Sequence, residues 1–210
     1  MTDNIILRHL PECVMVSGIE RPVNWGYRAM ILVELCMYDR ERSDEQKILD
    51  AMNIFYNRDI PHDMDAAMDR LLWFYRCGRN GHREGMKGAS GKQAKRCYCF
   101  GQDAPYIYAA FLGQYGIDLN ETKNYDLHWW KFHAMFESLS EDQKISKIMY
   151  YRTASVAGLP KEKRKFLNEM KKLYALEETG QVDDKMKLAK RNADMMAYVR
   201  RRAAEAHGNT

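Results

Sequence analysis

The feature that most constrains the fold of this chain is the recurrence of apolar residues at intervals of three and four between about residues 25 and 176. This is the period of an α-helix, and each apolar stripe needs another element to bury it. Capping and turn-forming residues divide the pattern into separate segments; Ser43 and Gln46 have the spacing of a capping box, and Gly116 is expected to end a helix. The sequence predicts helices over 25–37, 43–55, 63–76, 103–115, 125–138, 142–152 and 161–176.

The N-terminal region has a different pattern, which indicates a short β-hairpin. An apolar run at 13–16 and a mixed segment at 19–23 flank the turn-forming pair Ser17 and Gly18. With 210 residues the chain can bury a hydrophobic core without disulfides. We therefore expect a mainly α protein, in which residues 1–178 form a multi-helix globular domain with a small N-terminal β-hairpin.

Two basic segments are expected to lie outside the packed helices. Residues 79–96 contain four glycines, no aromatic residue and six basic side chains against Glu84. Such a composition cannot offset the entropy of ordering, so we predict a mobile basic loop over 79–97. Residues 179–210 are predicted to form a C-terminal amphipathic helical extension, or arm, which could dock on the domain, pair with another chain or remain frayed. Its narrow apolar seam consists of Val182, Met186, Ala189, Ala193 and Met196.

Secretion and membrane insertion are not expected. The chain has no run of about 18 apolar residues, and its start lacks the basic and apolar regions of a signal peptide. Its five cysteines are an odd number, which favours reduced thiols in a reducing cytoplasm.

A metal or nucleotide site is also not expected. Cys77, His82, Cys97 and Cys99 could be assembled into a zinc site, but one Cys-x-Cys pair is unlike the usual ligand spacing, and the sequence leaves zinc binding open. The segment 85–92 resembles a phosphate-binding loop, yet it has five residues between its glycines where that motif has four. We therefore predict no metal and no cofactor.

Catalytic patterns are weak as well. His133 and Glu137 share a helix face, as many surface pairs do, and the chain has no Gly-x-Ser-x-Gly nucleophile motif. We predict no catalytic residues and no enzyme. Nucleic-acid binding through the basic loop and the basic arm is the alternative, because residues 79–96 and 200–202 could neutralise phosphates. Aromatic residues for base stacking are missing from these stretches, which disfavours it.

Several motifs resemble those of a known phage family. The segment 125–139, YDLHWWKFHAMFESL, is followed by ISKIMYYR at 145–152. LWFYRCG at 72–78 precedes the basic loop, and QDAPYIYAAFL at 102–112 precedes QYGIDL at 114–119. In this order, over roughly residues 10 to 176, the chain resembles the bacteriophage gene-product-fifteen family, whose members resemble tail assembly chaperones.

The resemblance implies a role in virion morphogenesis in the host bacterial cytoplasm. A protein of this kind would keep the apolar, helical tape-measure protein soluble by protein–protein contacts, without a cofactor. Other tail assembly chaperones, tail-tube subunits and further copies of the chain are additional partners to consider. Within the central helix we favour burial for Trp129, while Trp130 could belong to a partner-binding surface. The candidate partner-binding residues are Trp129, Trp130, His133, Phe136, Val182, Met186 and Met196.

Overall fold

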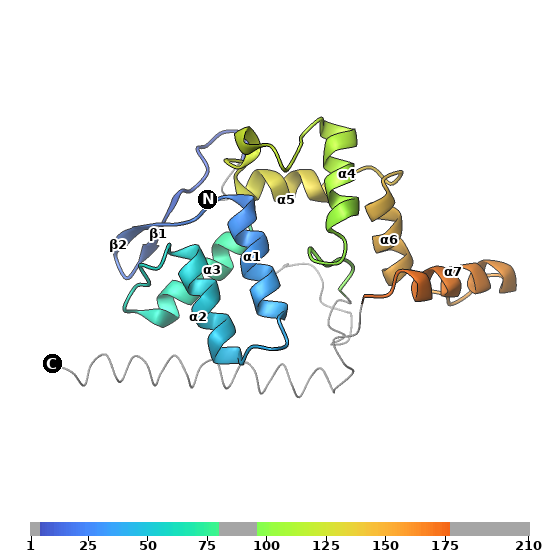
Figure 1. The fold of residues 1–210 in the computed structure, drawn as a ribbon, viewed down its shortest axis with the longest axis horizontal. Coiled ribbons are helices and arrows are strands. Elements are labelled where there is room, and N and C mark those ends of the chain that lie inside the picture. The colour runs from blue at the N-terminus through green and yellow to red at the C-terminus, as the bar shows by residue number, and fades with distance from the viewer. Residues whose placement is uncertain (1–4, 80–95, 177–210) are drawn as a thin grey trace. The chain divides into compact units, whose positions relative to one another are not determined.

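The computed structural model describes residues 5–79 and 96–176. Its contacts divide them into two compact units: the first comprises 5–79 and 125–134, and the second comprises 96–124 and 135–176. Helix α5 (Trp129–Glu137), which is labelled in Figure 1, contributes residues to both units. The predicted domain boundaries, 1–178 and 179–210, stay predictions.

The first unit begins with the predicted hairpin. Strands β1 (Cys13–Val16) and β2 (Ile19–Pro22) pair antiparallel, with Val16 opposite Ile19. Ser17 and Gly18 both have positive φ, 49° and 82°, as a tight two-residue turn requires. The sheet is therefore a minor element that closes one side of a helical unit.

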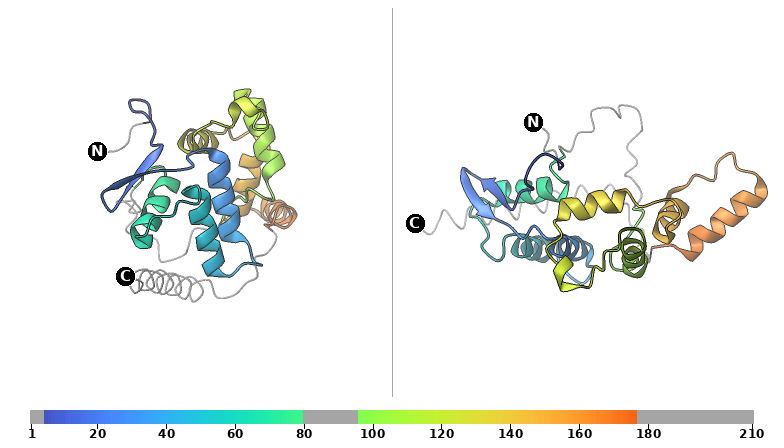
Figure 2. Two further views of the ribbon diagram at one scale, coloured as in Figure 1. Left: turned by 60° about the vertical axis from the view of Figure 1, so that its left-hand side comes forward. Right: turned by 90° about the horizontal axis from the view of Figure 1, so that it is seen from above.

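Three helices form the body of the first unit. They are α1 (Tyr27–Tyr38), α2 (Asp44–Phe55) and α3 (Met64–Tyr75). Helix α2 packs along α1, and α3 contacts both α2 and β1 (Figure 2). The expected capping box is present, since the Ser43 hydroxyl accepts from Gln46 N–H and the Gln46 side chain accepts from Ser43 N–H. Phe55 and Phe74 are fully buried and contact each other, with ring centroids 5.3 Å apart.

A backbone pairing delays the starts of two helices relative to the prediction. Gly26 forms an antiparallel bridge with His128, Tyr27 N–H donates to Leu127 O at 3.0 Å, and Trp129 N–H donates to Trp25 O at 2.9 Å. These residues have extended backbone or lie at a helix start, so α1 begins at Tyr27 and α5 begins at Trp129. The pairing joins two segments that are about 100 residues apart in the sequence.

The second unit contains the remaining helices of the described chain. These are α4 (Ala104–Tyr115), the short 3₁₀ helix η1 (Thr122–Asn124), α6 (Lys144–Thr153) and α7 (Lys161–Leu173). Gly116 ends α4 in the left-handed conformation, as predicted. Helix α6 contacts both α4 and α7. The buried apolar side chains of this unit are Phe100, Ile107, Ala110, Phe111, Phe136, Ile145, Ile148 and Leu167.

The predicted fold class is confirmed. The described residues form a mainly α structure with a small N-terminal β-hairpin. The helix at 122–124 was not predicted, because one turn is too short to show a period. Most of the predicted basic loop and the predicted C-terminal arm lie outside the described residues.

Candidate functional site: an aromatic cluster and an apolar helix face

An aromatic cluster is centred on the residues that open α5. His128 is 5% exposed, and Trp129 and Trp130 are 0% and 3% exposed. The His128 ring stacks on Trp25, with centroids 5.6 Å apart and planes at 12°. The bridge between Gly26 and His128 brings these rings together, so the cluster depends on the backbone pairing described above.

The histidine at the centre of the cluster has partners on both ring nitrogens. Its Nδ1 accepts a hydrogen bond from Trp130 N–H at 3.0 Å, which requires that nitrogen to be unprotonated. Nε2 therefore carries the proton and donates to Pro11 O, also at 3.0 Å. Burial is the main cause that lowers the pKa of His128 from its ordinary value. His128 is thus a neutral, structural residue that connects the N-terminal segment to α5.

Two tryptophans connect α5 to the end of α3. Trp129 Nε1–H donates to Tyr75 O and Trp130 Nε1–H donates to Phe74 O, both at 2.9 Å. The Trp129 ring also stacks on Tyr75, with centroids 5.4 Å apart. Because buried indole N–H groups need an acceptor, these bonds fix the position of both rings.

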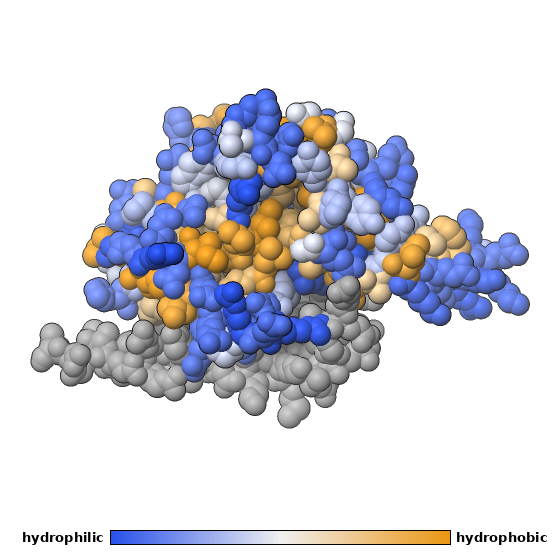
Figure 3. All heavy atoms as spheres, viewed as in Figure 1, coloured by the Kyte–Doolittle hydropathy of each residue, from blue (hydrophilic) through white to orange (hydrophobic). Residues whose placement is uncertain are grey.

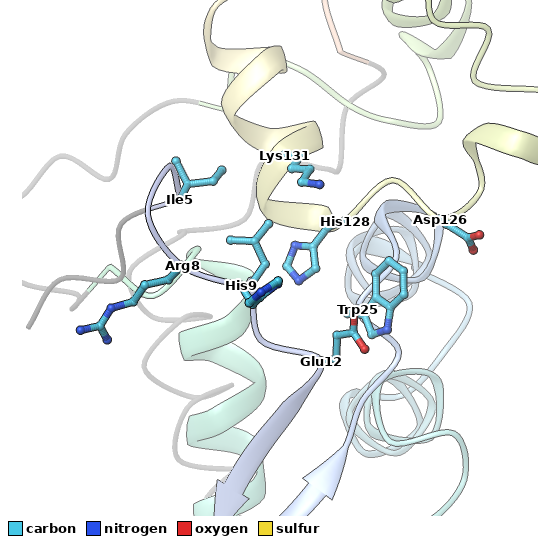
Figure 4. Close-up of a pocket in the computed structure, with 9 residues that line it drawn as sticks. Ile5, Arg8, His9, Glu12, Trp25, Asp126, His128 and Lys131 are labelled. Carbon is cyan, nitrogen blue, oxygen red and sulfur yellow. The ribbon is translucent and has the colours of Figure 1, made fainter.

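A hollow of about 340 Å³ lies beside this cluster (Figure 4). Its lining comes from the N-terminal segment, from Trp25 and from the start of α5, where His128 and Lys131 lie. Charges of both signs surround it, and His128 is committed to its two hydrogen bonds. The lining residues are Ile5, Arg8, His9, Leu10, Glu12, Trp25, Asp126, His128 and Lys131. Because both of its ring nitrogens are hydrogen-bonded, His128 lines the hollow as a structural residue.

Helix α1 carries an exposed apolar face, in addition to the exposed apolar side chains of the N-terminal segment and the hairpin. Leu32 is 54% exposed and Tyr38 46%, while Ile31 and Leu35 on the same side are half-buried. These positions follow intervals of three and four, so they share one side of the helix. Hydrophobic atoms gather over α1 in the space-filling view (Figure 3). We call Ile31, Leu32, Leu35 and Tyr38 the α1 face.

The α1 face carries little charge. Arg28 lies at its N-terminal end, with its guanidinium carbon 4.1 Å from the Tyr125 ring centroid. Glu34 lies on the other side of the helix, where it is 5% exposed and accepts a hydrogen bond from the Tyr75 hydroxyl. A neutral apolar helix face of this kind fits another apolar helix.

The predicted partner-binding residues differ in how exposed they are, and three of them lie outside the described residues. Burial of Trp129 is confirmed; Trp130 and Phe136 are buried as well, and His133 is partly exposed. Val182, Met186 and Met196 lie outside the described residues. Partner binding by any of them stays a prediction. The α1 face was missed because a dense apolar run at 25–37 predicts a helix that is buried on all sides.

The cysteines and the histidines suggest no metal centre within the described ranges. No group of three or more His, Cys, Asp or Glu side chains in those ranges could hold a metal ion. His82, one of the four possible zinc ligands, lies outside them. Burial is the main cause that raises the pKa of the Cys97 thiol. None of the helices in residues 5–79 and 96–176 has the length and hydropathy to span a membrane.

Comparison with known proteins assigns the family. The family model described as Bacteriophage Gp15 protein matches residues 6–176. This match covers the hairpin and all the helices described above. No curated protein and no solved structure matches the chain. The chain therefore belongs to the bacteriophage Gp15 family.

Proposed function

We propose that this protein is a non-enzymatic tail assembly chaperone, which keeps the tape-measure protein of its phage soluble in the host bacterial cytoplasm while the tail is assembled. Membership of a bacteriophage family supports the setting. The observation that carries the proposal is the α1 face, an apolar helix side with Leu32 more than half exposed. A holdase needs such a surface, and it needs no reactive groups.

The chemistry of the α1 face fits an apolar helical client. Its side chains are aliphatic or aromatic, and in the stretch from Ile31 to Tyr38 the one charged residue, Glu34, points to the other side. An amphipathic or apolar client helix can bury these side chains through contacts at intervals of three and four residues. Burial of exposed leucine side chains contributes about 25 cal/mol per Å² of apolar area.

Coexpression with the tape-measure protein of the same phage tests this function. We expect a soluble complex in affinity purification and size-exclusion chromatography, with the tape-measure protein insoluble when it is produced alone. The variant L32Q should fold normally, because glutamine has good helix propensity and Leu32 is exposed, but it should lose the complex.

The matched control is M15Q on the hairpin, where Met15 is 53% exposed, almost the same as Leu32. This variant should form the complex as the unchanged protein does. If the tape-measure protein stays insoluble in the presence of the unchanged chain, the chaperone function is wrong. If the complex forms equally well with L32Q and M15Q, the function stands and the α1 face is not its binding surface.

A further inference from the structure

Helix α7 leaves half of its apolar stripe exposed. Leu167 is the one side chain of α7 that is buried, at 4% exposure. Phe166 and Leu173, by contrast, are 53% and 66% exposed, and Met170 between them is half-buried. Phe166, Met170 and Leu173 follow one another at intervals of four and three, so they form one stripe along the helix.

The exposed stripe continues onto α6 through aromatic contacts. The Tyr151 ring meets Phe166 edge-on, with centroids 6.1 Å apart, and it also contacts Tyr150 at 6.0 Å. Tyr150 is 60% exposed. Tyr174 stacks on Tyr151 at the other end, so the rings are held in fixed positions. We call Tyr150, Tyr151, Phe166, Met170 and Leu173 the α6–α7 face; hydrophobic atoms are visible on α7 among hydrophilic ones in Figure 3.

This face lies in a strongly basic surrounding. Helix α7 contains six basic residues and two acidic ones, a net charge of +4 within Lys161–Leu173. Helix α6 adds Lys147 and also Lys144, whose Nζ lies 4.8 Å from the Tyr174 ring centroid. The α1 face, in comparison, has Arg28 at its end and no charge among its own side chains. The two faces therefore suit clients of different charge.

The two acidic residues of α7 help to identify the partner class. Glu162 precedes Phe166 by four residues and Glu169 precedes Leu173 by four, so each carboxylate borders the exposed stripe. A phosphate backbone or an anionic lipid surface lying along the stripe would meet these carboxylates. A protein helix can present a basic side chain to them while most of its charges remain acidic. Exposed Leu173 and half-buried Met170 also fit a protein helix better than stacked bases.

From these observations we infer that the α6–α7 face binds an amphipathic helix of another protein, whose apolar stripe is flanked mainly by Asp and Glu. The overall charge of this chain is +4, which disfavours a second copy as the occupant. Residues 177–210 contain seven basic and six acidic residues, so they do not supply the complementary charge either. The inference does not depend on the proposed function, because it concerns different residues and a different client charge.

Binding of two matched probe peptides to the full chain tests the inference. Both are fluorescein-labelled, stapled helical peptides with the same leucine stripe, flanked by glutamates in one and by lysines in the other. At low salt we expect the glutamate peptide to bind at least about tenfold more tightly, and its affinity to fall as salt screens the charges. The variants F166Q and L173Q should each weaken binding by about tenfold.

The control variant is I19Q on the hairpin, because Ile19 is 56% exposed, close to the value of Phe166. It should bind the glutamate peptide as the unchanged chain does. Equal affinity for the two peptides, or unchanged binding by F166Q and L173Q, overturns the inference. It is also overturned if F166Q abolishes binding of a labelled single-stranded oligonucleotide or of phosphatidylglycerol vesicles while neither peptide binds. A homodimer that F166Q dissociates would assign the face to a second copy instead.

Discussion

Trp129 is the residue whose burial has the clearest energetic consequence. Its side chain is 0% exposed, it stacks on Tyr75, and its indole N–H is bonded to Tyr75 O. We expect W129A to reduce the free energy of unfolding by about 3–5 kcal/mol, because a large cavity replaces the ring. W129F should cost less, since it keeps most of the apolar contact and loses the hydrogen bond. Urea denaturation measures both effects.

A matched substitution separates burial from residue type. Trp73 is half-buried and contacts the edge of Trp130, so W73A should cost clearly less than W129A. If W129A remained nearly as stable as the unchanged protein but failed to bind a partner, Trp129 would belong to an interface and not to the core.

His128 makes the stability of the protein depend on pH. Its pKa is lowered in the fold, chiefly by burial, so the unfolded chain binds a proton more readily. The stability that neutral His128 contributes is therefore present above the unfolded pKa of about 6.5 and is lost as pH falls below it. The loss is at most about 1.4 kcal/mol per pH unit for one proton.

Thermal unfolding between about pH 7.5 and pH 5 checks this sign. The variant H128Q should be less stable at neutral pH, and its melting temperature should depend less on pH than that of the unchanged protein. H62Q is the control, because His62 is exposed, and it should keep the original pH dependence. Equal pH profiles for the unchanged protein and H128Q would contradict the role of His128.

At the scale of elements, one buried ion pair holds several parts of the second unit together. Arg152 on α6 and Asp103 before α4 are 4% and 1% exposed and form two hydrogen bonds, of 2.6 and 2.9 Å. The guanidinium also donates to Cys97 O and Tyr174 O. A single side chain thus connects the segment before α4, α6 itself and the end of α7. Arginine provides this fork geometry, which lysine cannot reproduce.

Removal of one partner from this pair should be costly. We expect R152M and D103N each to lower the free energy of unfolding by about 3–5 kcal/mol, because an unpaired charge or unsatisfied carbonyl groups remain buried. R152K should not recover the free energy of unfolding that R152M loses, because lysine cannot form the same set of hydrogen bonds. In a double-mutant cycle, the variant with both changes should lose much less free energy of unfolding than the sum of the losses in the two single variants.

The exposed pair of Lys123 and Glu121, whose side chains are 72% and 49% exposed, provides the comparison. K123M should change the stability by less than about 1 kcal/mol. Additive effects of R152M and D103N would show that the two residues do not act as a pair.

The elements also show which parts of the fold local sequence can predict. Helix ends were predicted where the signal is local, as at the Ser43 capping box and at Gly116. The starts of α1 and α5 were predicted too early, because the bridge between Gly26 and His128 is a contact between distant segments. Exposure also depends on contacts between distant segments, so the period of the apolar residues alone did not reveal that Leu32 and Phe166 are exposed. A periodic stripe predicts that a face is apolar, whereas exposure depends on what packs against it.

At the scale of the whole molecule, replacing the basic segment at 81–94 tests whether the fold and the function need this segment. It contains no aromatic residue, and Met86 is its one large apolar side chain. We expect replacement of 81–94 by a glycine–serine linker of equal length to change the free energy of unfolding by less than about 1 kcal/mol, since little apolar surface is lost. Urea denaturation and coexpression with the tape-measure protein measure the two consequences.

The same variant separates the chaperone function from nucleic-acid binding. It removes three basic side chains, Arg83, Lys87 and Lys92, and so should weaken any binding that depends on phosphate contacts. If the protein acts through the α1 face, the variant should still yield a soluble complex with the tape-measure protein. A variant that folds normally but loses this complex, together with salt-sensitive oligonucleotide binding by the unchanged chain, would favour a role in which the basic segment contacts nucleic acid.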